Sequence, residues 1–175
     1  MLFNVLRELR QKIGSVSEYD LPEPSVRTDD VFLHDLEGTV GFLRTDRGLL
    51  VRVRAHGLID AECVRCLGEA RAHVDVDFEE EYVPTVDADT GAPVLIDEAE
   101  DTFRIDSRFE LDLREALRQY ILISEPQKPL CKETCAGLCP VCGQNLNENL
   151  HECEQPADER WSALAGLKTD IPEGN

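Results

Sequence analysis

Positive charge is scarce in this sequence. Its 175 residues include 36 aspartate and glutamate residues against 18 lysine and arginine residues, which gives a net charge of −18. A surface this acidic repels nucleic acid non-specifically. Long apolar runs are also missing: no stretch approaches the ~18 residues of a membrane span, and the first residues lack the apolar run of a signal peptide. We therefore expect a cytoplasmic protein without membrane association.

Cysteine is limited to seven residues, an odd number that cannot pair completely. Disulfides are rare in a reducing compartment, so a disulfide framework is not expected. Five of the seven lie in one stretch, CKETCAGLCPVCGQNLNENLHEC, at residues 131–153. The other two, Cys63 and Cys66, form a C-x-x-C pair within AECVRCLGE. Clustered cysteines of this kind favour metal binding.

The cysteine pattern supplies a full set of zinc ligands. Cys139 and Cys142 form a second C-x-x-C pair, and a two-residue spacer lets both thiolates face one tetrahedral ion at ~2.3 Å. The seven cysteines and one nearby histidine give eight donors, enough for two four-coordinate structural zinc ions. The predicted ligands are Cys63, Cys66, Cys131, Cys135, Cys139, Cys142, His151 and Cys153.

Two partitions of these donors are compatible with the sequence. In the first, the last four donors form a local site, and Cys131 and Cys135 share a second site with the distant Cys63 and Cys66. In the second, the two C-x-x-C pairs form a zinc ribbon and the other four donors form the second site; a single zinc with spare thiols is a third arrangement. The 64 residues between Cys66 and Cys131 cost about 4 kcal/mol to close, whereas structural zinc contributes ~10–16 kcal/mol. Zinc binding therefore outweighs the entropy cost of bringing Cys66 and Cys131 together.

The ligand set also argues against catalysis. Four protein ligands close the zinc shell, whereas a catalytic zinc keeps one position open for water or substrate. No H-x-E motif accompanies a C-x-x-C pair, as a zinc deaminase would need, and CVRC lacks the context of a thioredoxin-type motif. We expect neither enzymatic activity nor a small-molecule substrate. The rival hypothesis, a zinc-dependent enzyme, would require an unligated cysteine beside a metal-bound water.

The middle of the chain has the alternation typical of β-strands. Val51 and Val53 alternate with Arg52 and Arg54, so one face packs and the other carries charge. The segment AHVDVDFEEEYV alternates in the same way, and TDRG is a hairpin turn signal. Short apolar runs at VLI and FRI follow. These patterns predict an antiparallel sheet of five or six strands.

Helices are predicted to flank this sheet. Residues 4–13 and a short segment at 157–167 have helical spacing, and an amphipathic helix is predicted near 108–123, with Ser107 and Glu110 as a capping box and Pro126 at its end. The predicted class is α+β, an antiparallel β-sheet with flanking helices and a Cys-rich zinc-binding C-terminal segment. Residues 1–126 would form the β-rich core, and residues 127–175 the zinc-binding segment docked on it.

Acidic and basic residues are concentrated in different stretches. Residues 72–103 hold eleven acids and no lysine or arginine, which indicates either a solvated segment or a dock for a basic partner. Its candidate partner-binding residues are Asp75, Asp77, Glu79, Glu80 and Glu81. Residues 44–71 hold six arginines against four acids, and arginine binds phosphate well through its planar fork. The candidate nucleic-acid-binding residues are Arg44, Arg47, Arg52, Arg54 and Arg65, whose alternative role is the solvated face of a sheet.

These motifs together resemble a known family. C-x-R-C-L at 63–67, an amphipathic helix ending in proline, and C-x3-C-x-G-L-C-P-x-C-G-x-N-L-N from 131 are similar to the YceD-like family of large ribosomal RNA subunit accumulation proteins. In many members the cluster ends in C-x-C, whereas here His151 takes the first of those positions. The resemblance implies a non-catalytic protein that supports accumulation of large-subunit ribosomal RNA. Its partner would be a basic ribosomal or assembly protein, or alternatively precursor ribosomal RNA.

Overall fold

One mixed β-sheet makes up most of the computed structural model, which describes residues 1–28, 30–95, 102–148, 153 and 160. The strand order is β1-β8-β7-β6-β5-β4-β2, and β3 pairs with β4 beside β2. The strands are β1 (Leu2–Asn4), β2 (Val16–Asp20), β3 (Val26–Arg27), β4 (Phe32–Arg44), β5 (Leu49–Glu62), β6 (Glu69–Pro84), β7 (Phe103–Ile105) and β8 (Glu110–Asp112).

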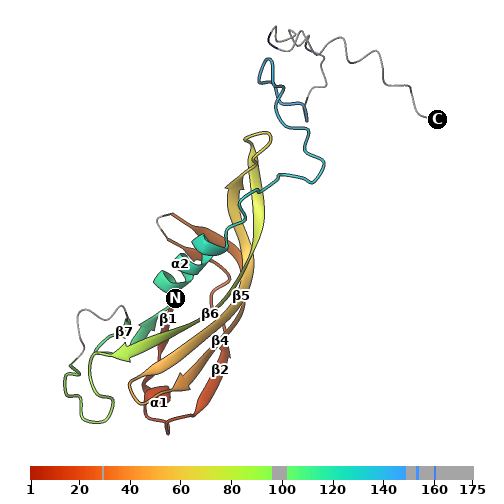
Figure 1. The fold of residues 1–175 in the computed structure, drawn as a ribbon. Helices are drawn as coiled ribbons and strands as arrows, with labels where there is room; N and C mark the ends of the chain where they lie inside the picture. The colour runs from red at the N-terminus through yellow and green to blue at the C-terminus, as the bar shows by residue number, and fades with distance from the viewer. Residues whose placement is uncertain (29, 96–101, 149–152, 154–159, 161–175) are drawn as a thin grey trace.

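The three long strands β4, β5 and β6 form an antiparallel meander, as the alternation predicts. Val51 and Val53 are fully buried while Arg52 and Arg54 are exposed. The predicted turn between β4 and β5 is closed by the Thr45 N–H, which donates to the Gly48 carbonyl at 3.0 Å. Strands β5 and β6 pair continuously along β5, and Figure 1 shows their hairpin extending well beyond the helix that covers the sheet.

The prediction of a purely antiparallel sheet is wrong at one pair. Strand β7 runs parallel to β6, with Tyr82 opposite Phe103, because the chain leaves β6 and returns to its side in the same direction. Eight strands rather than five or six are present among the described residues. Val94 and Leu95 of the VLI segment do not lie in a strand: the Val94 N–H donates to the Thr85 carbonyl at 3.0 Å, and Leu95 is fully exposed. Ile96 lies outside the described residues.

The flanking helices are smaller than predicted. The N-terminal helix α1 (Leu6–Leu9) is a single turn, and α2 (Arg114–Ser124) begins six residues after the predicted start. The capping-box prediction is wrong because Glu110 belongs to β8, whose residues pair with β1. Asp106, not Ser107, organises the preceding turn: its Oδ1 accepts the Arg108 and Glu110 N–H groups at 2.8 Å each. None of the described helices is long and apolar enough to cross a bilayer.

The main core lies between α2 and the facing side of the sheet, which we call the inner face. Leu117 and Ile121 of α2 are buried there, and the ring of Tyr120 stacks on Phe78 of β6 with centroids 4.3 Å apart. A second, much smaller buried cluster lies at the far end of the β5–β6 hairpin and contains Cys63, Cys66, Ala70 and Cys135. The described part of the segment after 127 therefore contacts the sheet at this hairpin tip (Figure 1). The helix predicted at 157–167 lies, apart from residue 160, outside the described residues.

Candidate metal centre

The turn between β5 and β6 carries the first pair of thiols. The Cys63 N–H donates to the Gly68 carbonyl at 2.8 Å, and the Leu67 N–H donates to the Cys63 carbonyl at 2.9 Å. Leu67 adopts a φ of 56°, in the left-handed region that lets the chain reverse between the two strands. This compact turn places both cysteine side chains in the interior of the hairpin tip.

The later cysteines reach this tip through main-chain hydrogen bonds. The Val64 N–H donates to the Pro129 carbonyl at 3.0 Å, and the Leu138 N–H donates to the Arg65 carbonyl at 3.1 Å. Gly137 makes the approach feasible, because its φ is +78° and a Cβ there would lie 3.1 Å from the Arg65 oxygen. The glycine of the C-x-G-L-C motif therefore serves the docking of two distant segments.

Four sulfur atoms meet at the tip and form what we call the first cluster: Cys63, Cys66, Cys131 and Cys135. Their Sγ atoms all lie within 4.8 Å of one another, with 3.8 Å between those of Cys63 and Cys135 and 3.7 Å between those of Cys66 and Cys131. A disulfide would need ~2.05 Å. A tetrahedron with metal–sulfur distances of ~2.3 Å has edges of about 3.8 Å, so this donor set fits one tetrahedral ion.

A second cluster forms within the C-terminal segment from Cys139, Cys142 and Cys153, whose sulfur atoms also lie within 4.8 Å of one another. The Cys139 N–H donates to the Gln144 carbonyl at 2.8 Å, which closes the turn that carries the C-x-x-C pair. His151, the predicted fourth ligand, lies outside the described residues. The cysteines are therefore grouped as in the first of the two partitions, not as in a ribbon that joins the C-x-x-C pairs.

The thiols of both clusters differ in acidity for identifiable reasons. Backbone N–H groups, those of Cys131 and Cys66 foremost, lower the pKa of Cys63 to about 6, and the N–H groups of Cys142 and Val141 do the same for Cys139. Burial and the neighbouring thiols raise the pKa of Cys131 to about 12. A bound metal ion favours the thiolate form and so counteracts the effects that raise the pKa of Cys131. Both clusters can hold metal ions on this chemistry.

One residue near the first cluster was missed by sequence reasoning. The Asn147 side chain donates from Nδ2 to the Cys135 sulfur at 3.4 Å, while its Oδ1 accepts the Ala136 N–H at 3.0 Å. Asn145 holds Asn147 in turn, because its Oδ1 accepts the Asn147 backbone N–H at 3.0 Å. The N-L-N motif at residues 145–147 is the sequence signal that could have identified Asn147. Both of its asparagines help to place the amide beside the Cys135 sulfur.

The candidate nucleic-acid-binding arginines of β5 lie opposite the acidic run. Arg52 contacts Glu79 at 3.0 Å (Nη1 to Oε1) and Asp77 at 3.6 Å, and Arg54 contacts Asp77 at 3.6 Å. These side chains share the side of the sheet remote from α2, which we call the outer face. On this face, Arg52 and Arg54 of the basic stretch and Asp77 and Glu79 of the acidic stretch form one surface of paired charges.

The other three candidate arginines have contacts within the fold. Arg44 donates to the carbonyls of Leu9 at 2.7 Å and Gly48 at 2.9 Å. Arg65 donates to the Cys135 carbonyl at 3.0 Å, so it helps to hold the first cluster together. Arg47 lies 3.9 Å from Glu81.

The candidate partner-binding acids are divided between the two faces of β6. Asp75, Asp77 and Glu79 are exposed on the outer face, where Glu81 also lies. Glu80 points the other way and accepts the Tyr120 hydroxyl at 2.6 Å, so it fixes α2 on the inner face. Glu80 is thus placed in a helix contact, and the other four remain on the open surface.

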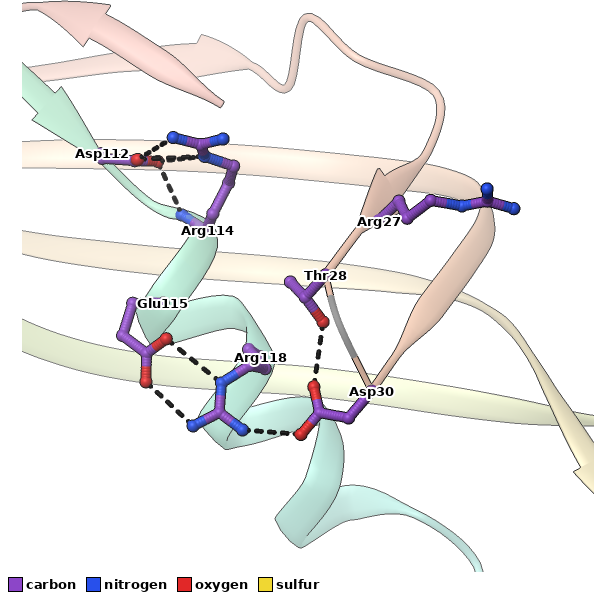
Figure 2. Close-up of a pocket in the computed structure, with 7 residues that line it drawn as sticks. All are labelled: Arg27, Thr28, Asp30, Asp112, Arg114, Glu115 and Arg118. Carbon is purple, nitrogen blue, oxygen red and sulfur yellow. Dashed lines mark hydrogen bonds and ion pairs between the residues drawn. The ribbon is translucent and has the colours of Figure 1, made fainter.

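A charged hollow of about 480 Å³ lies between the β3–β4 turn and the start of α2. Figure 2 shows Arg118 bridging Asp30 and Glu115, with Nη1–Oδ2 and Nη2–Oε1 distances of 2.8 and 3.0 Å. Arg114 donates from Nε to both carboxylate oxygens of Asp112, at 3.0 and 2.9 Å. These carboxylates are paired with Arg114 and Arg118, and the Arg118–Asp30 ion pair links α2 to the β3–β4 turn.

Proteins of three mycobacterial species are similar in sequence to this chain. Uncharacterized proteins of Mycobacterium bovis and Mycobacterium tuberculosis are each 31% identical over 121 residues, covering 69% of this chain and 56% of the relative. An uncharacterized protein of Mycobacterium leprae is 28% identical over 114 residues, covering 65% of this chain and 50% of the relative. The chain thus spans about half the length of the curated relatives it matches.

No solved structure matches the chain. The model of one family, described as large ribosomal RNA subunit accumulation protein YceD, matches residues 51–168. That range begins on β5 and includes all seven cysteines. The chain belongs to the YceD family.

Proposed function

We propose that this protein is a non-catalytic, zinc-stabilised factor that supports large-subunit ribosomal RNA accumulation by binding a basic ribosomal or assembly protein in the cytoplasm. Family membership is the observation that carries this proposal, because the family description names the large ribosomal RNA subunit. The matched range, residues 51–168, includes the hairpin tip and the cysteines of both thiol clusters.

Zinc is the metal that the donor chemistry favours. Four thiolates in a tetrahedral arrangement select zinc over magnesium or calcium, which prefer oxygen donors. The chain's own residues supply the four donors of the first cluster, a backbone that lowers the pKa of Cys63, and the Asn147 amide beside the Cys135 sulfur. A complete protein shell supports a structural role, since it offers no position to a substrate.

The charge distribution supports a basic protein as the partner. The net charge is −18, and the arginines of the outer face are paired with acids rather than arranged as an open cationic track. Such a surface attracts cationic groups and repels phosphate. Direct binding of precursor ribosomal RNA is therefore the less favoured alternative, and it is an outcome that the following experiment can identify.

The proposal is tested by deletion and capture in the same cells. Loss of the gene should lower the ratio of large-subunit to small-subunit ribosomal RNA, and the full-length wild-type protein should restore it. Zinc-loaded tagged protein should retain a basic ribosomal or assembly protein after nuclease treatment, with binding that weakens as salt rises. An unchanged RNA ratio would overturn the proposed function, and partner capture that disappears with nuclease would favour the RNA alternative.

A further inference from the structure

A shallow hollow on the outer face lies near the sheet edge, away from both thiol clusters. It has a volume of about 240 Å³ and is lined by residues of β2, β4 and β5, with Glu79 of β6 at one side. The hollow exists because Gly41 of β4, which has no side chain, lies between Glu18 of β2 and Arg52 of β5 in the sheet register. Its volume is below the ~300–1,000 Å³ of small-molecule sites, so it suits one inserted side chain.

The lining of this hollow combines aliphatic groups, two carboxylates and the guanidinium of Arg52, which is paired with Glu79 at 3.0 Å. Val16, Leu43 and Leu50 supply the apolar part, and Val16 is 70% exposed. Glu18 and Glu79 supply carboxylates at the rim. Lysine and arginine side chains match this combination, because they bury their aliphatic stems on apolar surface and keep the charged end at a polar rim.

Glu18 differs from the acids of β6 in its contacts. Asp77 and Glu79 are engaged by Arg52, and Glu81 lies near Arg47. Among the residues that the structure describes, no hydrogen bond or ion pair is recorded for the Glu18 carboxylate. Among the described residues, the negative charge at the β2 side of the hollow is thus not offset by a paired cation, in contrast to Asp77, Glu79 and Glu81.

We propose that the hollow over Gly41 receives a lysine or arginine side chain from an extended, basic segment of the partner. The aliphatic stem of that side chain packs on Val16, Leu43 and Leu50, and its cation is bound by Glu18. A second copy of this chain is disfavoured as the occupant, because two acidic outer faces repel each other. This inference rests on the proposed function, to which it adds the binding position and the chemistry of the bound segment.

The test uses the full, zinc-loaded chain and a fluorescent peptide of about twelve residues that alternates lysine and threonine. Gly41→Val should weaken binding about tenfold at low salt, because it fills the hollow without changing charge. The fold should tolerate the change: a Cβ at position 41 has Arg52 and Ser17 carbonyl oxygens as its nearest neighbours, at 3.8 and 3.9 Å. Gly41→Ala, which fills less of the hollow, should give an intermediate loss, and it replaces the valine variant if circular dichroism shows misfolding.

Charge is tested separately with a matched pair of variants. Glu18→Gln should weaken binding about threefold at low salt and less at high salt. Glu62→Gln removes the same charge at the far end of the outer face and should leave affinity within about twofold. A peptide with glutamine in place of lysine should not bind. Unchanged binding by Gly41→Val, or equal losses from Glu18→Gln and Glu62→Gln, would overturn the hollow as the binding position.

Failure of this inference can be told apart from failure of the proposed function. If the tagged Gly41→Val protein still retains the same basic partner from cells as the wild type, the function stands and the hollow is not the site. If the wild type retains no basic partner and its deletion leaves the ribosomal RNA ratio unchanged, the proposed function itself is wrong.

Discussion

The body of the sheet and the tip of the β5–β6 hairpin are stabilised by different chemistry. The body buries a continuous apolar cluster that includes Tyr82, Phe42 and Leu117, all at most 2% exposed. The tip buries Cys63, Cys66, Ala70 and Cys135, with Leu130 and Leu138 packed beside them. Apolar burial stabilises by roughly 25 cal/mol per Å², so the body can fold on its own core. The tip has too few apolar side chains for this, so we expect its order to depend on a metal ion bound by its thiols.

Chelation should separate the two regions most strongly. Removing zinc should abolish protection of the backbone amides around Cys63 and across 129–148, because structural zinc supplies an apparent ~10–16 kcal/mol. The amides of Val53 and Val76 in the body should keep theirs. Hydrogen exchange with metal analysis, which should find about two zinc ions per chain, measures both. Equal loss in the body would show that the comparison is wrong.

A substitution in the apolar core should destabilise the body of the sheet and leave the metal-binding tip intact. Leu117→Ala removes a fully buried side chain of α2 and should lower the free energy of unfolding by about 2–5 kcal/mol. The thiol clusters do not contact this position, so the zinc content at neutral pH should stay the same. Urea unfolding, followed by tyrosine fluorescence, gives the stability. A parallel loss of zinc would mean that body and tip fold as one unit. Leu122→Ala, at an exposed position of the same helix, is the control.

Substitutions at two glycines can test the close contact between Gly137 and the Arg65 carbonyl, where the C-terminal segment docks on the hairpin tip. Gly137→Ala should weaken metal retention by about 2 kcal/mol, because the new Cβ combines a left-handed φ with a contact to the Arg65 oxygen. Gly143→Ala has a similar φ of +75° but meets nothing within 4 Å. Competition with a chromogenic chelator measures both variants. Similar losses would assign the effect to backbone conformation alone.

The smallest effect is expected from removing the hydrogen bond between Asn147 and the Cys135 sulfur. Asn147→Ala removes the N–H donor to the Cys135 sulfur and should lower zinc affinity about tenfold. Gln144→Ala is the control, because Gln144 is exposed and contributes its backbone carbonyl, not its side chain, to the turn around Cys139. This variant should leave zinc affinity unchanged. If the two variants match, the Asn147 contact contributes nothing to metal binding.

The alternation of apolar and polar residues was sufficient to predict the β-rich core, because a strand that buries one face must repeat every two residues. It correctly assigned the buried and exposed sides of β5 and β6. Helix boundaries were less accessible. The segment from Ser107 to Leu113 carries a capping pattern and apolar spacing, yet Glu110–Asp112 pairs with β1 at the other end of the chain. Such long-range strand pairing overrides the local preference for helix, and the nearby sequence gives no sign of it.

The candidate metal residues were predictable as a set because ligand chemistry is written in residue types and short spacings. Their grouping was not, since Cys66 and Cys131 meet only through the docking of residues 129–138 on the hairpin tip. The charges show the same limit. The acidic run and the arginines occupy separate stretches of sequence, but antiparallel pairing places Arg54 opposite Asp77.

The sequence by itself determined the eight candidate donors, the acidic balance and the two-residue period of the long strands, because these depend only on composition and near neighbours. The tertiary structure decided which sulfur atoms meet, which acids are neutralised and where a hollow opens over Gly41. Each of these depends on strand register, which positions residues from distant parts of the chain beside one another.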